Sequence, residues 1–361
     1  ILRIIGKTAD WPHPHEWLKR TVGNDWIYYS TGGYTGVFET TGEYYLPNLP
    51  YSTNNALGGR PFNNDHIRSA TNQWHHNLET LRATIRSPDR QVSRFLDAAM
   101  ANSPENLKKK SESFALCHGG PITVLPPDTR HVDYNVIPLN LSEGCLYKCR
   151  FCKVKNSKPF SVKSDSQILE QITQLKHFYS RDLLNYNSVF IGEHDGLNGG
   201  SDKLIFTIST ALERLRLGLS WCHDSNIFLF GSVFSLLNSP ASLYKELSAM
   251  KPRIYINVGL ESADQATLDT LGKPLTSQMV HDAFDLIQDI NDRYQNIEIT
   301  SNFVTDDSLG TDHYQTLISL IRDRIPKQKS KGCVYLSPLQ FGSPSRAQLF
   351  KFYRLSEANA S

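Results

Sequence analysis

The second and larger part of the chain alternates short apolar runs with longer stretches of helical periodicity. In the first helical stretch, apolar residues recur three and four positions apart at Ile168, Ile172 and Leu175. Parallel strands joined by right-handed crossover helices produce this order, and six such units fall short of the eight that close a full barrel. The pattern therefore predicts an α/β fold, an open (βα)6 barrel over residues 135–342. The six predicted strands are Val136–Leu141, Ser188–Ile191, Ile227–Phe230, Ile254–Leu260, Ile297–Val304 and Val334–Phe341.

Polar residues with good capping propensity stand before the apolar stripes of the predicted helices. Ser164 and Asp165 precede the first stripe, and Ser201 and Thr276 precede the second and fourth. Ser239-Pro240 marks the start of the third, since proline is favoured in the first helical turn. A fifth stripe carries Tyr314, Leu317, Ile318 and Ile321.

Residues 1–134 lack this alternation. Residues 11–62 are rich in Gly, Tyr, Asn and Pro, and segments 26–29 and 37–45 predict a hairpin that turns near Thr41-Gly42. Residues 64–101 have helical character broken at Ser87-Pro88, and the proline-rich stretch 119–128 predicts a linker. We expect a mixed α+β extension over 1–134, the barrel over 135–342 and a short tail over 343–361.

Composition narrows the class of protein. The 361 residues include 38 Lys and Arg and 36 Asp and Glu, which gives a net charge of +2. The chain therefore lacks the large positive electrostatic field that would attract nucleic acid or an anionic membrane. No apolar run reaches the roughly 20 residues that span a bilayer, and the first residues do not resemble a signal peptide. The sequence predicts a soluble, cytoplasmic protein with neither a membrane nor a nucleic acid as partner.

The chain has six cysteines, which are too few for a disulfide-stapled scaffold of this length. Three of them, Cys145, Cys149 and Cys152, lie within eight residues. A tetrahedral zinc site would need a fourth Cys or His at comparable spacing, and His118 and His131 do not provide it. Three thiolates suit an iron-sulfur cube instead, because they leave one iron free to bind another molecule. A structural zinc site is the less favoured alternative.

The other three cysteines are scattered singly at Cys117, Cys222 and Cys333. They could converge on an auxiliary cluster in three dimensions. None forms a close pair, which favours ordinary buried cysteines.

The clustered cysteines, with Phe151 directly before the last and Glu143-Gly144 before the first, resemble the signature of the radical S-adenosylmethionine (radical SAM) superfamily. The resemblance implies a partial barrel of the radical SAM type and a [4Fe-4S] cluster on Cys145, Cys149 and Cys152. In that family the amino and carboxylate groups of SAM chelate the fourth iron. One electron from the cluster cleaves SAM to a 5′-deoxyadenosyl radical, which abstracts hydrogen from a substrate.

The ends of the predicted strands carry the next candidates, because barrel active sites lie at the carboxyl ends of the strands. The second strand ends in Gly192-Glu193-His194-Asp195. The radical SAM motif there is two glycines, Glu and Pro, which implies that Gly192 and Glu193 contact the SAM amino group. His194 departs from the motif, and we expect His194 and Asp195 to face the substrate. A turn with a solvated acid is the alternative.

The fourth strand ends in Gly259-Leu-Glu-Ser262, with Leu-Gly-Lys at 271–273. This segment is similar to the radical SAM subgroup of oxygen-independent coproporphyrinogen oxidases and methylthiotransferases, which implies that Glu261 and Ser262 face SAM. Asn302, near the end of the fifth strand, and Phe151 complete the SAM set. Ser337 and Gln340 on the sixth strand are substrate candidates. An ordinary helix N-cap for Ser262, and ordinary polar strand ends elsewhere, are the alternatives.

The expected activity is reductive cleavage of SAM at a [4Fe-4S] cluster, followed by hydrogen abstraction from a small organic substrate. An electron donor such as ferredoxin or flavodoxin is the expected partner. Nothing in the sequence chooses among rearrangement, methylation, C–C bond formation and oxidation. Two alternatives stay open: a non-catalytic relative that binds a ligand or handles haem, and a radical SAM enzyme that modifies a protein partner.

Overall fold

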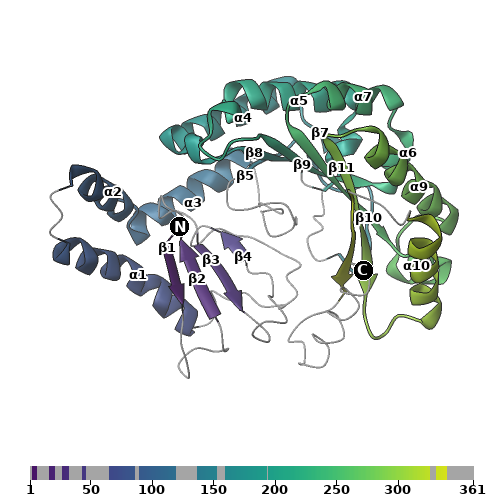
Figure 1. Cartoon of the computed structure of the whole chain (residues 1–361), viewed down its shortest axis with the longest axis horizontal. Coiled ribbons are helices and arrows are strands. Elements are labelled where there is room, and N and C mark those ends of the chain that lie inside the picture. The colour runs from purple at the N-terminus through teal and green to yellow at the C-terminus, as the bar shows by residue number, and fades with distance from the viewer. Residues whose placement is uncertain are drawn as a thin grey trace. The chain divides into compact units, whose positions relative to one another are not determined.

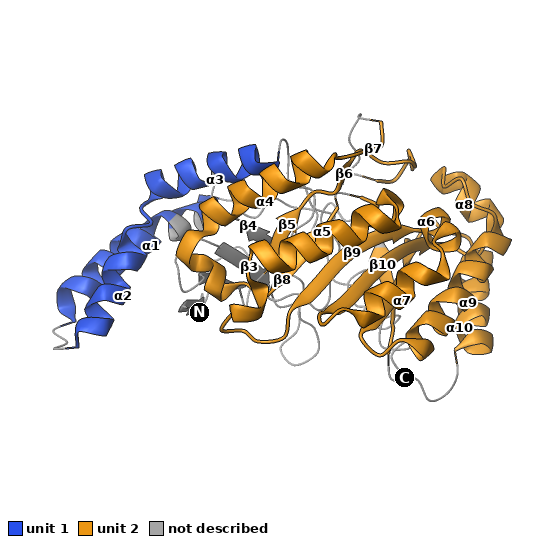
Figure 2. Cartoon of the chain, turned by 90° about the horizontal axis from the view of Figure 1, so that it is seen from above, with its two compact units in different colours: residues 1–134, 341–349 blue, residues 135–340, 350–361 orange. Residues whose placement is uncertain are grey.

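A computed structural model gives the structure of the chain in two compact units (Figure 2). The first comprises residues 1–134 and 341–349, and the second comprises residues 135–340 and 350–361. Each unit is treated by itself below. The residues that the structure describes are 2–5, 16–20, 27–31, 43–45, 65–85, 89–118, 136–152, 159–192, 194–325 and 331–339.

The second unit is built on a six-stranded sheet in which every strand is parallel to its neighbours. The order is β12-β11-β10-β9-β8-β5, so the strands lie side by side in the order in which they occur along the chain. Helices lie along one side of this sheet (Figure 1). The predicted open parallel sheet and its six strands are confirmed. The strands are β5 Val136–Leu139, β8 Ser188–Ile191, β9 Asn226–Ser232, β10 Arg253–Glu261, β11 Ile297–Thr305 and β12 Val334–Pro338.

Two helices of this unit begin with the capping residues that the sequence predicts, whereas Ser201 is the first residue of α5 and Gly200, not Ser201, is its N-cap. Ser164 forms a full capping box with Gln167, and the Thr276 hydroxyl accepts from the Met279 amide at 3.2 Å. The two short helices α6 and α8 were not predicted. The α-helices are α4 Asp165–Tyr179, α5 Ser201–Arg214, α6 Val233–Asn238, α7 Ala241–Ala249, α8 Gln265–Leu271, α9 Ser277–Arg293 and α10 Thr311–Arg324, with 3-10 turns η3 Ser180–Asn185, η4 Gly196–Gly199 and η5 Leu217–Leu219.

The two faces of the sheet differ in character because side chains alternate along each strand. On β10, Ile254 and Ile256 are fully buried, whereas the alternate positions Tyr255 and Asn257 are half-buried. The Tyr255 ring stacks on Phe228 of β9 at 5.0 Å between centroids. One face therefore forms an aliphatic core, and the other carries aromatic and amide side chains.

The first unit contains a four-stranded antiparallel sheet, β1 to β4 in chain order, and three helices. Tyr28 of β3 lies opposite Tyr44 of β4 in an antiparallel pair. The predicted turn at Thr41-Gly42, the linker 119–128 and the tail 343–361 lie outside the described residues. The elements are β1 Leu2–Ile5, β2 Glu16–Arg20, β3 Ile27–Thr31, β4 Glu43–Tyr45, α1 Asp65–Thr84, α2 Arg90–Met100 and α3 Pro104–His118.

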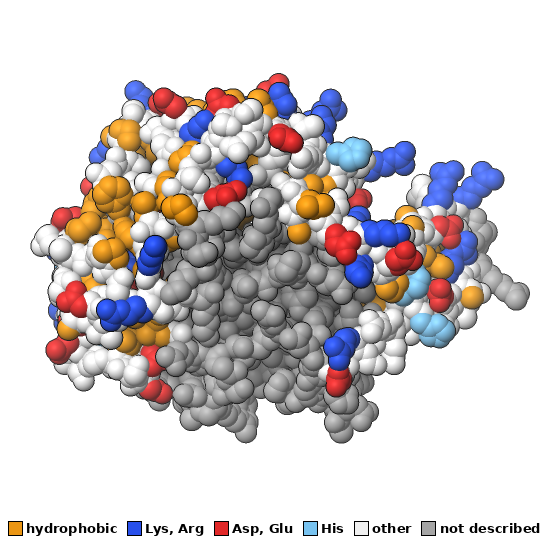
Figure 3. All heavy atoms as spheres, turned by 180° about the vertical axis from the view of Figure 1, so that it is seen from behind, with side chains coloured by type: hydrophobic (Ala, Val, Ile, Leu, Met, Phe, Trp, Pro, Cys, Tyr) orange, Lys and Arg blue, Asp and Glu red, His pale blue; other side chains and the backbone are white. Residues whose placement is uncertain are grey.

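The described surface mixes charges of both signs. Acidic and basic side chains are interspersed over the face drawn in Figure 3. Within the described residues, every helix is too short or too polar to cross a bilayer.

Candidate functional site

The three clustered cysteines lie on a loop whose two ends are fastened together. Ser142–Glu143 (β6) pairs antiparallel with Ser161–Val162 (β7) just after the carboxyl end of β5. Next to this pair of strands, Lys163 Nζ donates to Glu143 Oε1 at 2.6 Å. Gly144 has φ of +75°, a left-handed conformation that glycine adopts without strain, and it turns the chain into the loop. The loop therefore leaves the sheet at its carboxyl edge.

The thiols of this loop are sheltered from water to different degrees. Cys149 is buried, and Cys145 and Cys152 are half-buried. Burial is the main cause that raises the pKa of the Cys145 and Cys149 thiols, and the neighbouring thiols of the loop raise both further. Among the described residues, no three His, Cys, Asp or Glu side chains gather into a site for one metal ion.

A buried ion pair lies beside the cysteine loop. Lys273 Nζ donates to Glu261 Oε1 at 2.8 Å and to the Gly259 carbonyl at 3.0 Å, and both side chains are about nine-tenths buried. The ammonium group also lies 5.5 Å from the centre of the Tyr147 ring, within the loop. Burial opposes the charge of Lys273, but the Glu261 carboxylate and the Cys149 thiol raise its pKa above the ordinary value. In return, the lysine lowers the pKa of Cys145 and Cys149.

The backbone at the end of β10 directs Glu261 toward Lys273. The pairing of β10 with β11 shifts register between Gly259 and Glu261, and Glu261 has φ of +68°. A residue other than glycine held in this region is strained, and such strain concentrates at functional sites. The bulge turns the Glu261 carboxylate back over Gly259, where a Cβ atom would lie 2.4 Å from Oε1.

Replacing Gly259 with alanine is expected to displace this ion pair. The added methyl would also lie 3.2 Å from Lys273 Nζ, so the carboxylate and the ammonium must both move. We expect a loss of about 1–3 kcal/mol in the free energy of unfolding, the usual cost of overpacking. Urea denaturation measures it, with Gly310→Ala as the matched control because a Cβ there meets no atom within 4 Å. Equal unfolding free energies for Gly259→Ala and Gly310→Ala would contradict the expected displacement of the Lys273–Glu261 pair.

The end of β8 places Gly192 and Asp195 near the same loop. Gly192 has φ of +94°, and a Cβ there would lie 2.8 Å from the Cα of Gly196. Asp195 is only 3% exposed. Its Oδ1 accepts from the Ser235 hydroxyl at 2.8 Å and from the amide of Ser232 at 3.3 Å. Its Oδ2 is buried and has no hydrogen-bond partner within the described part of the chain.

Burial raises the pKa of the Asp195 carboxyl, because these hydrogen bonds only partly offset the cost of removing the charge from water. Burial raises the pKa of the Tyr147 hydroxyl, and the nearby Asp195 carboxylate raises it further. That hydroxyl accepts from the Phe234 amide at 3.3 Å, which connects the cysteine loop to the start of α6. His194 is half-buried beside Asp195, and Glu193 lies outside the described residues.

Ser262 is completely buried, with its hydroxyl bonded within the protein. His313 Nε2 donates to the Val304 carbonyl at 2.9 Å, so Nδ1 is free to accept from the Ser262 hydroxyl at 2.8 Å. The Ser262 oxygen in turn accepts from the Asp264 amide at 3.0 Å. The helix cap itself is Asp264, whose side chain accepts from the Thr267 amide. Ser262 and His313 thus connect the ends of β10 and β11.

The Ser262–His313 pair predicts a pH dependence of stability. Burial lowers the pKa of His313 below its ordinary 6.5, despite opposing contributions from the Val304 carbonyl and Asp264. The native state then binds fewer protons than the unfolded state, so stability from this group is present above pH 6.5 and is lost as the pH falls below it.

We expect wild type to exceed His313→Gln in unfolding free energy at pH 7.5, and the difference to shrink between pH 6.5 and 5. Urea denaturation across this range measures it. A difference that stays constant would contradict the neutral buried histidine.

The remaining candidates from the sequence lie on the sheet, in the cysteine loop or outside the described residues. Asn302 Nδ2 donates to Asn257 Oδ1 at 2.6 Å, an amide pair between β11 and β10. Ser337 lies on β12 opposite Val304, and Phe151 is half-buried in the cysteine loop. Gln340 lies outside the described residues.

Sequence reasoning missed Lys273, His313 and Tyr147 as members of this site. The Leu-Gly-Lys segment that ends in Lys273 was the available signal, since it follows the strand with Glu261. The structure brings together the cysteine loop, Glu261 with Lys273, and Asp195. The scattered Cys222 and Cys333 precede β9 and β12, so they lie toward the opposite, amino edge of the sheet.

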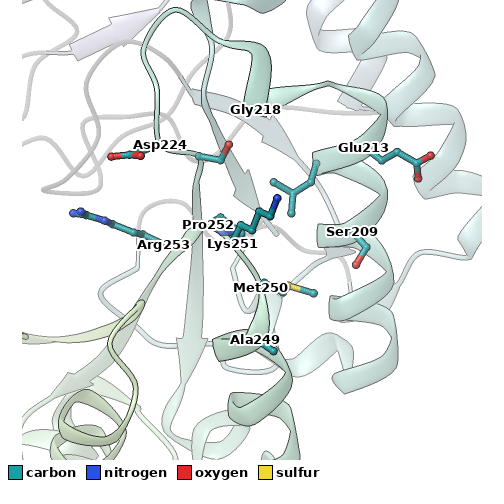
Figure 4. Close-up of a pocket in the computed structure, with 11 residues that line it drawn as sticks. Ser209, Glu213, Gly218, Asp224, Ala249, Met250, Lys251, Pro252 and Arg253 are labelled. Carbon is teal, nitrogen blue, oxygen red and sulfur yellow. The ribbon is translucent and has the colours of Figure 1, made fainter.

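A hollow of about 760 Å³ also lies at this amino edge, where β9 and β10 begin (Figure 4). Its charged side chains, Glu213, Asp224, Lys251 and Arg253, are exposed to solvent. No residue singled out in the sequence lines it. Because the candidate chemistry gathers at the carboxyl edge, this hollow is not the candidate site.

Comparison with known proteins gives similarity to solved structures only. No family model matches the chain, and no curated protein matches it. The cobalamin-dependent SAM radical enzyme OxsB is 16% identical over 61% of this chain, with a TM-score of 0.36, and the chain spans only 30% of it. A radical SAM methyltransferase from Sphaerobacter thermophilus is 14% identical over 81% of this chain and 86% of its own, with a TM-score of 0.40.

Methylornithine synthase is similar to the same extent, at 14% identity over 82% of this chain and 76% of its own, with a TM-score of 0.39. At TM-scores below 0.5 these likenesses do not extend to the activity of this chain. Its chemistry must come from its own residues.

Proposed function

We propose that this protein is a radical SAM enzyme that cleaves SAM reductively at a [4Fe-4S] cluster and acts on a small organic substrate. One observation carries the proposal. Three cysteines in the spacing of the radical SAM signature lie on a fastened loop at the carboxyl edge of an open parallel sheet, beside the buried Lys273–Glu261 pair. Polar groups at this edge of an α/β sheet are where ligands bind.

The donor set fits the cluster. Cys145, Cys149 and Cys152 would each bind a different iron, so the three sulfurs need not meet around one ion. Metal binding requires thiolates. Burial raises the pKa of Cys145 and Cys149 overall, and the nearby Lys273 cation opposes that rise. A bound cluster would supply one electron to SAM, and the 5′-deoxyadenosyl radical released from SAM would abstract a hydrogen atom from the substrate.

The residues around the loop also fit the charged end of SAM. The amino acid moiety of SAM carries an ammonium and a carboxylate. Glu261 is a buried acidic group for the ammonium, and the neighbouring Lys273 is a buried basic group for the carboxylate. Gly192, at the carboxyl end of β8 with φ of +94°, is a further proposed contact of SAM. Phe151, Glu193 and Asn302 are proposed contacts for the rest of SAM.

We assign Ser262 a positioning role, since its hydroxyl is held by His313 and bonded by the Asp264 amide. It connects the end of β10, which carries Glu261, to β11.

We propose that the substrate binds over the face of the sheet that carries Tyr255 and Asn257, with Asp195 and His194 at its edge. Asp195 Oδ2 is buried and has no hydrogen-bond partner among the described residues, so it is a proposed partner for a polar group of the substrate. Ser337 and Gln340 are further proposed contacts.

An anaerobic assay tests the proposal. The protein is reconstituted with iron and sulfide, its cluster is verified spectroscopically, and SAM and a reductant are added. We expect 5′-deoxyadenosine. A protein with an intact cluster that binds SAM but releases none would instead be a ligand-binding relative, and the enzyme proposal would be wrong.

A further inference from the structure

Tyr147 lies in the middle of the cysteine loop, between Cys145 and Cys149. Its side chain is half-buried, whereas the flanking side chains of Leu146 and Lys148 are exposed to solvent. Tyr147 is therefore the inward-facing residue of this segment. A phenol takes no chemical part in the reductive cleavage of SAM, so the role of Tyr147 has to be sought in its contacts with neighbouring elements.

The hydroxyl of Tyr147 is held where β9 passes into α6. It accepts from the Phe234 amide at 3.3 Å. Burial raises the pKa of this hydroxyl, and a hydrogen bond with the Ser232 side chain opposes the rise. The Ser232 oxygen is fixed in turn, because it accepts from the Ser235 amide at 3.0 Å, and the Ser235 hydroxyl donates to Asp195 Oδ1 at 2.8 Å. Ser232, Ser235 and Asp195 are all buried, so Tyr147 is anchored to a packed part of the protein.

The ring of Tyr147 lies against the buried ammonium group of Lys273. The ring centre is 5.5 Å from Nζ, within the range of about 6 Å for a cation–π interaction. Within the described residues, two of the three N–H groups of this ammonium donate, to Glu261 Oε1 at 2.8 Å and to the Gly259 carbonyl at 3.0 Å. The ring therefore restricts where the ammonium lies and leaves its third N–H for a ligand.

We propose that Tyr147 is a positioning residue for SAM: its anchored ring holds the Lys273 ammonium where the SAM carboxylate binds. The inference rests on the proposed function, because it concerns how SAM is bound. Tyr147 connects three strands of the sheet, since it belongs to the loop after β5, bonds Ser232 at the end of β9 and contacts Lys273, the partner of Glu261 at the end of β10. A charged side chain held in place before binding loses less conformational freedom when the ligand arrives.

A role in folding alone is the alternative, and Ser232 distinguishes the two. The Ser232 hydroxyl is the N-cap of α6 as well as a partner of Tyr147. If Ser232 acts on SAM through Tyr147, then removing both hydroxyls costs no more SAM affinity than removing the Tyr147 hydroxyl alone. If each hydroxyl only stabilises its own segment, the two effects are independent and add.

The test compares wild type with Tyr147→Phe, which keeps the ring but removes its anchor, Tyr147→Leu, which removes both, Ser232→Ala, and the double variant Ser232→Ala/Tyr147→Phe. Tyr244→Phe is the matched control, since Tyr244 is a buried tyrosine on α7, outside the site. Equilibrium dialysis on reconstituted protein measures SAM affinity, and electron paramagnetic resonance of the reduced cluster detects its response to SAM. In protein without a cluster, the rate at which iodoacetamide alkylates Cys149 is followed by mass spectrometry.

We expect Tyr147→Phe to bind SAM about three- to tenfold more weakly than wild type, the effect of one lost hydrogen-bonded contact, and Tyr147→Leu to bind it at least about tenfold more weakly. Ser232→Ala should weaken SAM binding as Tyr147→Phe does, and the double variant should bind SAM as Tyr147→Phe does, because both substitutions remove the same contact. Cys149 should be alkylated faster in Tyr147→Phe than in wild type. Tyr244→Phe should match wild type in every measurement.

Equal SAM affinity in wild type and Tyr147→Phe would overturn the positioning role, and faster alkylation of Cys149 in that variant would then assign Tyr147 to folding of the loop alone. Additive losses of SAM affinity in the double variant would also overturn it. Failure of the proposed function would look different. Wild type with a full cluster would then release no 5′-deoxyadenosine from SAM and a reductant, whereas a failed positioning role leaves wild type active.

Discussion

Cys149→Ala is expected to lose the [4Fe-4S] cluster and, with it, all release of 5′-deoxyadenosine. Cys149 is the most sheltered of the three loop thiols, and Lys273 favours its thiolate. Two cysteines cannot hold three irons of a cube, and the buried alanine methyl offers no replacement ligand. Iron and sulfide content, visible absorption and electron paramagnetic resonance of the reconstituted protein measure the loss.

Cys222→Ala is the matched control for this variant, because Cys222 is exposed and lies toward the other edge of the sheet. It should reconstitute and turn over like wild type. If Cys149→Ala retained a full cluster, the ligand assignment would be wrong. If Cys222→Ala lost the cluster, an auxiliary site would have to be considered.

Lys273→Met is expected to destabilise the protein by about 3–5 kcal/mol, because it leaves the Glu261 carboxylate buried without its partner. The double variant Lys273→Met/Glu261→Gln removes both charges at similar volume. We expect it to recover most of the lost stability, since replacing a whole buried ion pair by uncharged groups is often neutral. Urea denaturation measures both variants.

The same double variant separates a structural role of the pair from a role in SAM binding. Equilibrium dialysis on reconstituted protein should show a loss of SAM affinity of tenfold or more, as expected for removal of charge-assisted contacts worth about 1.5–3 kcal/mol each. Restored stability with unchanged SAM affinity would assign the pair to folding alone. An unstable double variant would contradict the expected compensation.

The sequence predicted the parallel sheet well because each strand is an apolar run with a helix-length connection behind it. β8 was predicted to the residue, and Ser164 and Thr276 cap helices where predicted. α6 and α8 escaped prediction because six and seven residues are too few to show a 3.6-residue period. β1 and β2 were not predicted because charged residues interrupt their apolar positions, at Arg3 in β1 and at Glu16 and Lys19 in β2, so neither is a clear apolar run.

The site was only partly predictable. Cysteine spacing is a local signal, so the cysteine loop could be singled out from eight residues. The Lys273–Glu261 pair depends on a bulge and a left-handed residue in β10, which no local pattern reveals. The Ser262–His313 bond joins residues 51 positions apart and depends on how β10 and β11 align. Such contacts arise from tertiary packing, and periodicity does not encode them.

The strand order of the sheet has a consequence for how the protein is made. Since β5, β8, β9, β10, β11 and β12 lie side by side in chain order, each strand can pair with its predecessor as it leaves the ribosome. The cysteine loop emerges after β5, whereas Glu261 and Lys273 follow β9, after more than a hundred further residues have been synthesised. During that interval the nascent loop has its thiols but not the ion pair that later lies beside them, so the surroundings of the loop are completed only after β10 and α8 have been synthesised.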